Sequence, residues 1–343
     1  MSLRTGEFFI YSERMCGQMD KRRTTDRKMT GRQRRRQRRR QRRRRRMLAA
    51  AMLSVILISL TAFFVLGQGK GETVSRTEQK DVENLNGLNS RNAVLMDLEA
   101  GEILADKGAD EKVYPASLTK IMTAVLAVEN IPDLQESITV PDGIFPGLYA
   151  EGASLAGFCP GEEAVGMDLL YGVLLPSGAE CCLTLAGRIA GSEEAFVDMM
   201  NEKAGELGMD GTHFTNSTGL QDENHYSTVR DISTLLRYAL ENETFRQVFT
   251  SSRHSTSPSA CHPEGFTFVS TMFQEMSSAQ VNGGEILGGK TGYTKDAGLC
   301  LASLAVIDGK EYILVTAHAN GNHETKQYHV QDAVKVYDQI GKS

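Results

Sequence analysis

The chain has 343 residues, of which 41% are hydrophobic and 24% are charged; these proportions are typical of a globular protein and exclude a mostly disordered one. The formal net charge of −5 hides two opposite parts, because residues 1–46 carry 19 Lys and Arg against 4 Asp and Glu, or +15, which leaves −20 for the remainder. This asymmetry predicts a basic tail joined to a separate acidic body.

An apolar segment follows the basic tail and is long enough to cross a membrane. The arginine-rich run at 31–46 meets 21 uncharged residues at 47–67, "MLAAAMLSVILISLTAFFVLG", and about 20 such residues span a bilayer as one helix. The positive flank is expected to stay in the cytoplasm, which places the rest of the chain outside the cell. The segment is longer than the apolar core of a secretory signal and no A-x-A site follows it, so we expect an uncleaved single-pass anchor.

Two other interpretations of these segments stay open. The apolar segment could be a buried core helix, and the arginine-rich run could bind RNA. Positive-inside topology and attraction to anionic lipids are sufficient to explain arginines beside a membrane span. We therefore expect the membrane as a partner and no nucleic acid.

The outer part of the chain predicts a stalk and one domain. Residues 68–90 are polar without apolar periodicity, as in a stalk, and residues 91–343 form the predicted domain. A β-hairpin is expected at its start, β-rich runs around a tight turn near its end, and helices between and after them. The segments are 93–97 and 102–106 for the hairpin, 298–319 for the β-rich runs, and 118–130, 166–190, 192–208, 227–242 and 329–340 for helices. This order predicts a mixed α/β fold, in which both termini complete one antiparallel sheet and a helical lobe is inserted.

The cysteines and histidines outside the predicted anchor predict neither a disulfide framework nor a metal site. The five outer cysteines are an odd number, and two of them lie in an apolar helical run, which favours buried free thiols. The seven histidines include no H-E-x-x-H motif or other close pair, and Cys261 and His262 are poorly placed as neighbours to share one zinc ion. We expect the histidines on the surface or in loops. The five cysteines are Cys159, Cys181, Cys182, Cys261 and Cys300.

The stretch "PASLTKIMTA" at 115–124 places Ser117 three residues before Lys120 at an expected helix start. Residues i and i+3 share a helix face, so the lysine can lie beside the serine hydroxyl. That hydroxyl becomes an effective nucleophile when a base takes its proton, and a desolvated lysine can be the base. The positive end of the helix also favours negative charge developing near Ser117. Taken alone, a motif this short is explained better by a serine that caps the helix and a solvated lysine than by a nucleophile and its base.

Two further short motifs could carry chemistry. In "PSGAE", Ser177 could pass a proton between a nucleophile and a leaving group. In "GGKTGYT" at 288–294, Lys290 and Thr291 on an edge strand could hold a carboxylate by charge and hydroxyl. The small Gly288, Gly289 and Gly292 would let a substrate backbone approach closely. Each motif alone is a weak signal.

The three motifs together are specific. Ser-x-x-Lys, then Ser-Gly-x, then Lys-Thr-Gly is the signature of serine penicillin-recognising enzymes. The sequence resembles the low-molecular-mass D-alanyl-D-alanine carboxypeptidases, which are penicillin-binding proteins of cell-wall maturation (a peptidase S11-like family). The resemblance runs from about residue 92 to 319 and includes "NAVLMDLEAGEILADKGADEKVYPASLTKIMTA", "NSTGLQDENHYST" and "LGGKTGYTKDAGLCLASLA". It implies the β-lactamase/D,D-peptidase-like fold.

The resemblance assigns roles residue by residue. Ser117 corresponds to the acylated nucleophile, Lys120 to its general base and Ser177 to the proton-shuttling serine. Lys290 and Thr291 match the residues that hold the terminal carboxylate of the substrate. These roles are expectations carried over from the family.

The resemblance also implies an oxyanion hole. The backbone N–H groups of Ser117 and of Tyr293, which follows Gly292 of the third motif, would stabilise the charge that develops in the transition state. A second lysine near Lys120 would oppose its protonation and help to keep it basic.

One position departs from the family pattern. The second motif usually ends in Asn, and Ala179 stands in its place. Alanine lacks the amide that would bind substrate and the neighbouring lysine, which puts substrate binding at this corner in doubt. A catalytically weak penicillin-binding or wall-sensing protein of the same fold is therefore one alternative. A β-lactamase is another, although no glutamate lies in the Glu-x-x-Leu-Asn setting that would activate its deacylating water.

The implied protein is an extracellular serine carboxypeptidase. It would remove the C-terminal D-alanine from peptidoglycan stem peptides through an acyl-enzyme on Ser117. No metal or organic cofactor is expected. The expected partners are stem peptides, β-lactams that acylate the same serine, and the membrane.

Overall fold

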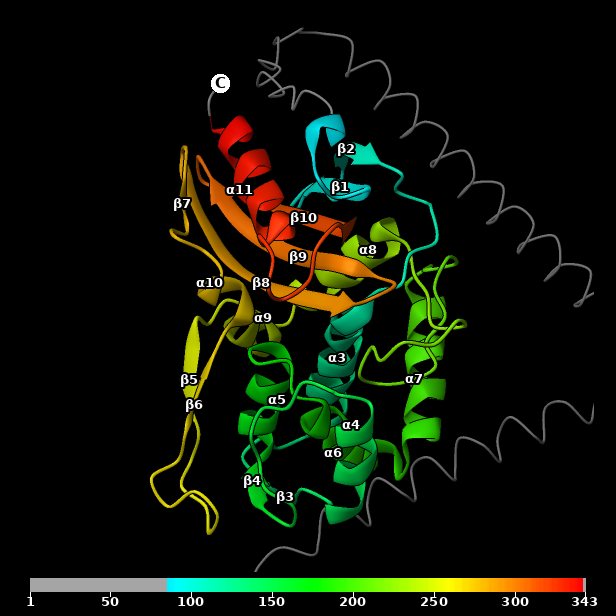
Figure 1. Cartoon of the computed structure of the whole chain (residues 1–343), viewed down its shortest axis with the longest axis vertical. Coiled ribbons are helices and arrows are strands. Elements are labelled where there is room, and N and C mark those ends of the chain that lie inside the picture. The colour runs from blue at the N-terminus through cyan, green and yellow to red at the C-terminus, as the bar shows by residue number, and fades with distance from the viewer. Residues whose placement is uncertain (1–84, 342–343) are drawn as a thin grey trace, which may run out of the picture. The chain divides into compact units, whose positions relative to one another are not determined.

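The computed structural model describes residues 85–341 (Figure 1). The predicted basic tail at 1–46 and the predicted anchor at 47–67 lie outside these residues, as does the stalk up to residue 84. No helix within 85–341 is long and apolar enough to cross a membrane. The described fold includes the last residues of the predicted stalk, since Leu85 and Leu88 are buried and Asp332 accepts hydrogen bonds from Asn89 and Ser90.

A six-stranded antiparallel sheet forms one layer, in the order β2-β1-β10-β9-β8-β7. The N-terminal β1 pairs with the C-terminal β10, with Val94 opposite Val315, so both ends of the domain complete one sheet, as predicted. Strands β9 and β10 are buried almost throughout because apolar clusters cover both faces of the sheet. The strands are β1 Asn92–Asp97, β2 Ile103–Lys107, β7 Gln280–Val281, β8 Gly284–Thr294, β9 Gly298–Ile307 and β10 Lys310–Ala319.

The tight turn predicted between the last two strands joins β9 to β10. Asp308 and Gly309 have φ of 49° and 77°. Two consecutive positive φ values are typical of the two-residue turn whose twist matches that of a hairpin.

Helices cover the sheet and form a lobe beside it (Figure 1). Helix α3 lies at the centre of the lobe. Its residues 120–127 are buried, and all of them except Lys120 and Thr123 are apolar. Helix α8 packs on β1 and β10, and α11 packs on β9 and β10. The helices are α3 Lys120–Asn130, α4 Phe145–Ala150, α5 Gly166–Leu174, α6 Ala179–Ala190, α7 Glu193–Glu206, α8 Val229–Leu240, α9 Glu243–Phe249, α10 Thr271–Gln274 and α11 Tyr328–Ile340.

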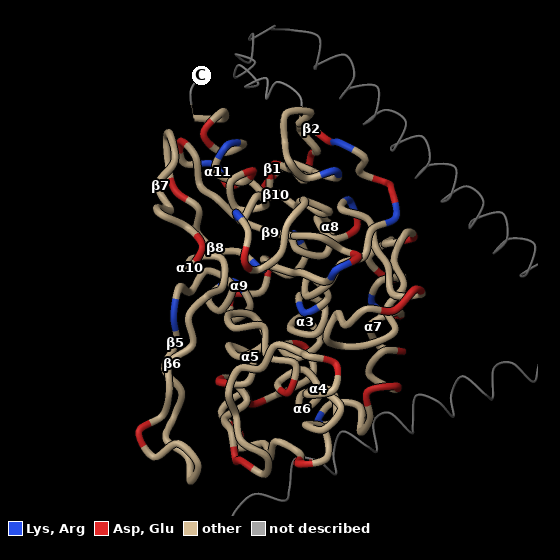
Figure 2. Tube along the Cα trace, viewed as in Figure 1, with Lys and Arg blue, Asp and Glu red and all other residues tan. Residues whose placement is uncertain are grey.

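Short elements connect the larger ones. Two small two-stranded antiparallel sheets and three 3-10 turns lie within the described residues. They are β3 Ser137–Thr139 with β4 Glu163–Val165, β5 Arg253–Ser255 with β6 Thr267–Val269, and η1 Leu85–Gly87, η2 Ala116–Thr119 and η3 Asp142–Ile144. Figure 2 shows acidic and basic residues dispersed over the sheet and the lobe, the pattern of a solvated surface.

The single helix predicted at 166–190 is two helices in the structure. Helix α5 ends at Leu174 and α6 begins at Ala179. Pro176 cannot continue the helix because it lacks an N–H donor, and Ser177 adopts a positive φ of 69°. The break carries the second sequence motif into the interior between the two helices.

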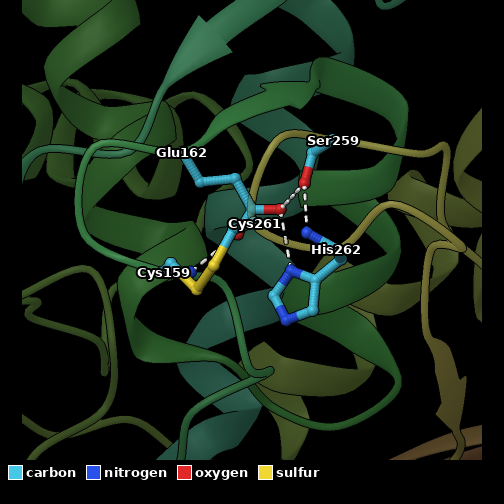
Figure 3. Close-up of a disulfide and its surroundings, with 5 residues drawn as sticks. All are labelled: Cys159, Glu162, Ser259, Cys261 and His262. Carbon is cyan, nitrogen blue, oxygen red and sulfur yellow. Dashed lines mark hydrogen bonds and ion pairs between the residues drawn. A yellow bond between two sulfur atoms is a disulfide. The ribbon is translucent and has the colours of Figure 1, made fainter.

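The prediction of free thiols is wrong for one pair of cysteines. Cys159, in the loop before β4, forms a disulfide with Cys261, between β5 and β6 (Figure 3). The two are 102 residues apart, so no local pattern in the sequence pointed to the pairing. Cys181, Cys182 and Cys300 are free and buried, as predicted.

A hydrogen-bond network surrounds this disulfide (Figure 3). Buried Glu162 accepts hydrogen bonds from the Cys159 backbone N–H and the Ser259 hydroxyl, and it pairs with His262 at 2.9 Å. Cys159, Glu162, Cys261 and His262 bring possible metal-ligand atoms within 4.8 Å of one another. Because the two sulfurs are bonded to each other, neither is a thiolate ligand in this state.

The expectation that the histidines lie on the surface or in loops is wrong for His329, whereas His225 lies in a loop as expected but is also buried. His225 and His329 are each only 2% exposed. His225 is held by Thr119 and Thr215. His329 lies in the first turn of α11.

Candidate active site

The structure brings the first motif together as predicted. Ser117 lies in η2 and Lys120 is the first residue of α3, so one helical turn separates them. The Lys120 Nζ atom is 3.1 Å from the Ser117 Oγ atom, and it also donates to the Thr218 carbonyl oxygen. These contacts fix the amino group beside the hydroxyl.

Glycines let two other chain segments pack against the backbone at Ser117. A Cβ on Gly219, which has φ of +80°, would lie 1.9 Å from the Ala116 carbonyl oxygen. A Cβ on Gly292 of strand β8 would lie 3.0 Å from the Ser117 nitrogen. Ala116 itself has an unusual φ of 46°. The nucleophile candidate is therefore held from both sides by backbone that only glycine allows so close.

Burial lowers the pKa of both lysines at the site. Lys120 is 3% exposed, and loss of hydration lowers the pKa of its amino group, while Glu180 and the neighbouring cysteines oppose the shift. Burial lowers the pKa of Lys290 further, and repulsion from Lys120 adds to this. The sequence analysis expected a second lysine to help keep Lys120 basic, whereas the cause that lowers the pKa of Lys120 is desolvation.

The second and third motifs meet through their side chains. Lys290 is fully buried, and its Nζ atom donates to the Ser177 Oγ atom at 3.0 Å and to the Thr291 carbonyl oxygen at 2.8 Å. Ser177 thus contacts Lys290, just as Ser117 contacts Lys120. This hydrogen bond joins the third motif to the second.

Strand β8 borders the site with its free edge. Strand β7 pairs only with Gly284 and Glu285, so β8 is the edge strand from Gly288 to Thr294. The Thr291 hydroxyl lies 2.6 Å from the Thr271 hydroxyl of α10, and Tyr293 pairs with Leu299 of β9. An edge strand leaves backbone N–H and C=O groups free to pair with an extended peptide.

A cleft runs across Ser117 and has two arms. Ser117, Ser154, Tyr293 and His323 border both arms. One arm, called here the Thr291 arm, is also lined by Ser177, Thr271, Gln274, Glu275, Thr291 and His329. The other is lined by Lys120, Ala179, Thr218, Leu220, Gln221 and Lys295. A substrate chain could therefore pass over the Ser117 hydroxyl from one arm to the other.

Ala179, the departure from the family pattern, begins α6 at the cleft. Its backbone N–H donates to the Ser154 carbonyl oxygen at 2.8 Å, and its side chain offers no polar group. The next residue, Glu180, is buried and accepts hydrogen bonds from the Ala156 and Gly157 N–H groups. Burial raises the pKa of Glu180.

Sequence reasoning missed several residues around the cleft. Thr218 contributes a backbone carbonyl, which carries no signature in sequence. Ser154 and Thr271 lie in segments without a motif, and the second motif drew attention to Ser177 rather than to Glu180. The only sequence signal for Glu180 is its position three residues after Ser177 of the second motif.

Comparisons with known proteins agree with this geometry. The family model described as peptidase S11, D-alanyl-D-alanine carboxypeptidase, matches residues 76–321. The Bacillus subtilis D-alanyl-D-alanine carboxypeptidase DacF is 34% identical over 223 residues, which cover 63% of this chain and 54% of DacF. The Escherichia coli D-alanyl-D-alanine carboxypeptidase DacC is 38% identical over 154 residues, covering 43% of this chain and 38% of DacC. The matches thus span about half or less of these curated relatives.

Solved structures share the fold. The crystal structure of the Streptomyces K15 DD-transpeptidase superposes with a TM-score of 0.66 at 25% identity, covering 74% of this chain and 97% of that chain. A D-alanyl-D-alanine carboxypeptidase from Mycobacterium tuberculosis superposes with a TM-score of 0.61 at 25% identity, covering 73% of this chain and 90% of that chain. The predicted mixed α/β fold is confirmed at this level.

Proposed function

The chain belongs to the peptidase S11 family of D-alanyl-D-alanine carboxypeptidases, and from that premise we propose that it is a serine carboxypeptidase that removes the terminal D-alanine of peptidoglycan stem peptides. The observation that carries the proposal is the contact between Ser117 and buried Lys120 at 3.1 Å. A serine and a lysine whose neutral form is favoured by burial are the two parts that acyl transfer requires.

The first half of the reaction forms an acyl-enzyme. The Ser117 hydroxyl attacks the carbonyl carbon of the penultimate D-alanine, and Lys120 takes its proton. The backbone N–H groups of Ser117 and Tyr293 would stabilise the oxyanion. The intermediate collapses, the peptide C–N bond breaks, and the departing D-alanine nitrogen receives a proton through Ser177.

The second half releases the peptide. A water molecule attacks the ester carbonyl, with Lys120 as the base, and the Ser117 oxygen leaves with a proton. β-Lactams present a strained amide and a carboxylate to the same groups, so they are expected to acylate Ser117.

The experiment that tests this function follows D-alanine release from diacetyl-Lys-D-Ala-D-Ala by the full-length protein. We expect steady release that prior treatment with benzylpenicillin abolishes and a metal chelator leaves unchanged. Inhibition by the chelator and not by penicillin would contradict the proposal. Penicillin labelling without release would favour the alternative of a weak penicillin-binding protein, with Ala179 as its cause.

The proposed location rests on the sequence. The arginine-rich run at 31–46 and the apolar segment at 47–67 support a single-pass anchor with the catalytic domain outside the cell. We expect the full-length protein to remain in the membrane fraction after carbonate washing and to be cleaved by protease added to intact cells stripped of their wall. Release by carbonate, or protection from the protease, would contradict this topology.

A further inference from the structure

The disulfide region gathers four possible metal ligands from two segments that are far apart in the sequence (Figure 3). Cys159 and Glu162 lie in the loop before β4, and Cys261 and His262 lie between β5 and β6. One ligand atom from each lies within 4.8 Å of the other three. Thiolate sulfur, imidazole nitrogen and carboxylate oxygen are the ligands that zinc takes in proteins, and four of them complete a structural zinc site. The sequence analysis considered Cys261 and His262 poorly placed as neighbours, whereas the fold directs both side chains to one cluster.

The distances in this cluster are close to those of a zinc site. The Cα atoms of Cys159 and Cys261 are 6.5 Å apart. Tetrahedral zinc with bonds of about 2.3 Å to sulfur places two sulfurs about 3.8 Å apart, a separation that these Cα positions allow. The His262 Nδ1 and Glu162 Oε1 atoms are 2.9 Å apart, against about 3.4 Å for two such atoms on one zinc ion. Once the S–S bond is broken, small side-chain movements are therefore enough to form the site.

Hydrogen bonds orient the carboxylate of the cluster. Glu162 is 5% exposed, and it accepts hydrogen bonds from the Cys159 backbone N–H at 2.7 Å and from the Ser259 hydroxyl. The Ser259 oxygen in turn accepts a hydrogen bond from the His262 backbone N–H at 3.0 Å. One hydroxyl thus joins the carboxylate to the residue that carries the imidazole. Contacts of this kind hold metal ligands in the orientation that binding requires.

Aromatic packing joins the two segments in addition to the disulfide. The ring of buried Phe158, next to Cys159, packs edge-on against Phe266 and Phe268, with centroids 5.2 Å and 5.8 Å away. The centroids of the His262 and Phe266 rings are 4.4 Å apart. Because these contacts do not depend on the S–S bond, we expect the two segments to stay together when the bond is reduced.

We propose that the reduced form of this cluster is a structural zinc site, in which the two cysteine thiolates, the imidazole of His262 and the carboxylate of Glu162 bind one Zn²⁺ ion. Soft thiolate ligands favour zinc over magnesium or calcium. The disulfide and the zinc ion are alternative cross-links between the same two segments. The inference goes beyond the proposed function, because no step of that reaction uses these residues. A chelator is still expected to leave the activity of the disulfide form unchanged.

The exchange of one cross-link for the other balances in electrons and protons. A dithiol gives two electrons to the disulfide and becomes a disulfide itself, and the two cysteines become thiols. Zn²⁺ then displaces one proton from each thiol, because the thiolate is the form that binds metal. The His262 Nδ1 atom binds as part of a neutral imidazole, with the ring proton on Nε2. Zinc binding to the reduced form therefore releases two protons and needs no further reactant.

The test compares metal binding by the reduced and the disulfide forms. Full-length protein without a purification tag would carry Cys16→Ser, which removes the cysteine that lies outside residues 85–341. It would be reduced with dithiothreitol, freed of the dithiol under anaerobic conditions, and titrated with Co²⁺ and then with Zn²⁺. We expect the reduced form to bind one Co²⁺ ion with the absorption of a tetrahedral thiolate complex, and Zn²⁺ to displace it. Zinc should also raise the midpoint of thermal unfolding of the reduced form. The disulfide form should show none of these changes.

Three substitutions test the ligand assignment in the reduced protein. Cys261→Ser, His262→Ala and Glu162→Gln should each weaken zinc binding by about 10- to 100-fold or more, since even the loss of a group that orients a ligand costs about that much. His254→Ala is the matched control. His254 lies on β5 and pairs with buried Asp168 at 2.6 Å, so it resembles His262 in its setting, and its loss should leave the zinc affinity unchanged.

Three results would overturn the proposal. They are the absence of thiolate absorption in the reduced protein with Co²⁺, equal metal binding by the disulfide form, and an unchanged zinc affinity in any of the three ligand variants. The proposed function is tested separately, because D-alanine release is measured on the disulfide form.

Discussion

Replacing Ser117 by alanine is expected to lower D-alanine release by about 10⁴-fold or more, because removing the nucleophile of an acyl-transfer enzyme removes the covalent pathway altogether. The variant should fold normally. Ser117 is half-buried in a 3-10 turn, and within residues 85–341 its hydroxyl forms a hydrogen bond only with the Lys120 amino group. The measurement is kcat/KM on diacetyl-Lys-D-Ala-D-Ala, with circular dichroism to confirm the fold.

Ser154→Ala is the matched control for this variant. Ser154 lines both arms of the cleft, but no step of the proposed reaction uses its hydroxyl. We expect its kcat/KM to stay within about tenfold of wild type. If Ser117→Ala kept activity comparable to Ser154→Ala, the assignment of the nucleophile would be wrong.

Replacing Lys120 by methionine is expected to lower kcat by about 10²- to 10⁴-fold, the usual contribution of a general base. Methionine fills a similar volume, so the buried site should stay packed. Because burial lowers the pKa of Lys120 below the ordinary lysine value of 10.5, the neutral base persists to lower pH than in a free lysine. The rate of the wild type should fall as the pH drops through this lowered pKa, and the variant should lose that limb of the profile.

The matched control is Lys310→Met, which removes an exposed lysine at the β9–β10 turn. Its pH–rate profile should coincide with that of the wild type. An unchanged acid limb in Lys120→Met would show that another group titrates there, and the general-base assignment would fail.

The local part of the site could be predicted from the sequence because it is set by helical spacing. Ser117 and Lys120 are three residues apart, so their contact follows from one turn of helix. The contact between Ser177 and Lys290 spans 113 residues, and no spacing rule predicts it. Their proximity was an expectation of the family resemblance alone.

The sheet was predicted for a similar reason. Short apolar or β-rich runs marked the strands at both ends, and the tight turns between them favoured antiparallel neighbours. Pro176 is a signal for a helix end, but because the residues around it are apolar, the sequence analysis predicted one helix where the structure has α5 and α6. The disulfide between Cys159 and Cys261 and the burial of His329 depend on contacts between distant segments. No pattern in the sequence predicts such contacts.

The roles of buried ionisable groups were the least predictable. The sequence analysis expected Lys290 to hold a carboxylate by its charge, but it did not predict that this lysine is completely buried, which favours the neutral form of its amino group. An amino group without water favours its neutral form and bonds to Ser177. Burial is a property of the whole fold, so such assignments had to wait for the structure.

The central claim is that Ser117 becomes covalently acylated. Its most direct test is mass spectrometry of the full-length protein after brief exposure to benzylpenicillin, followed by peptide mapping of the adduct. We predict a mass increase of one penicillin, located on Ser117 and absent from Ser117→Ala. An adduct on another residue, or no adduct in a protein that still releases D-alanine, would contradict the account.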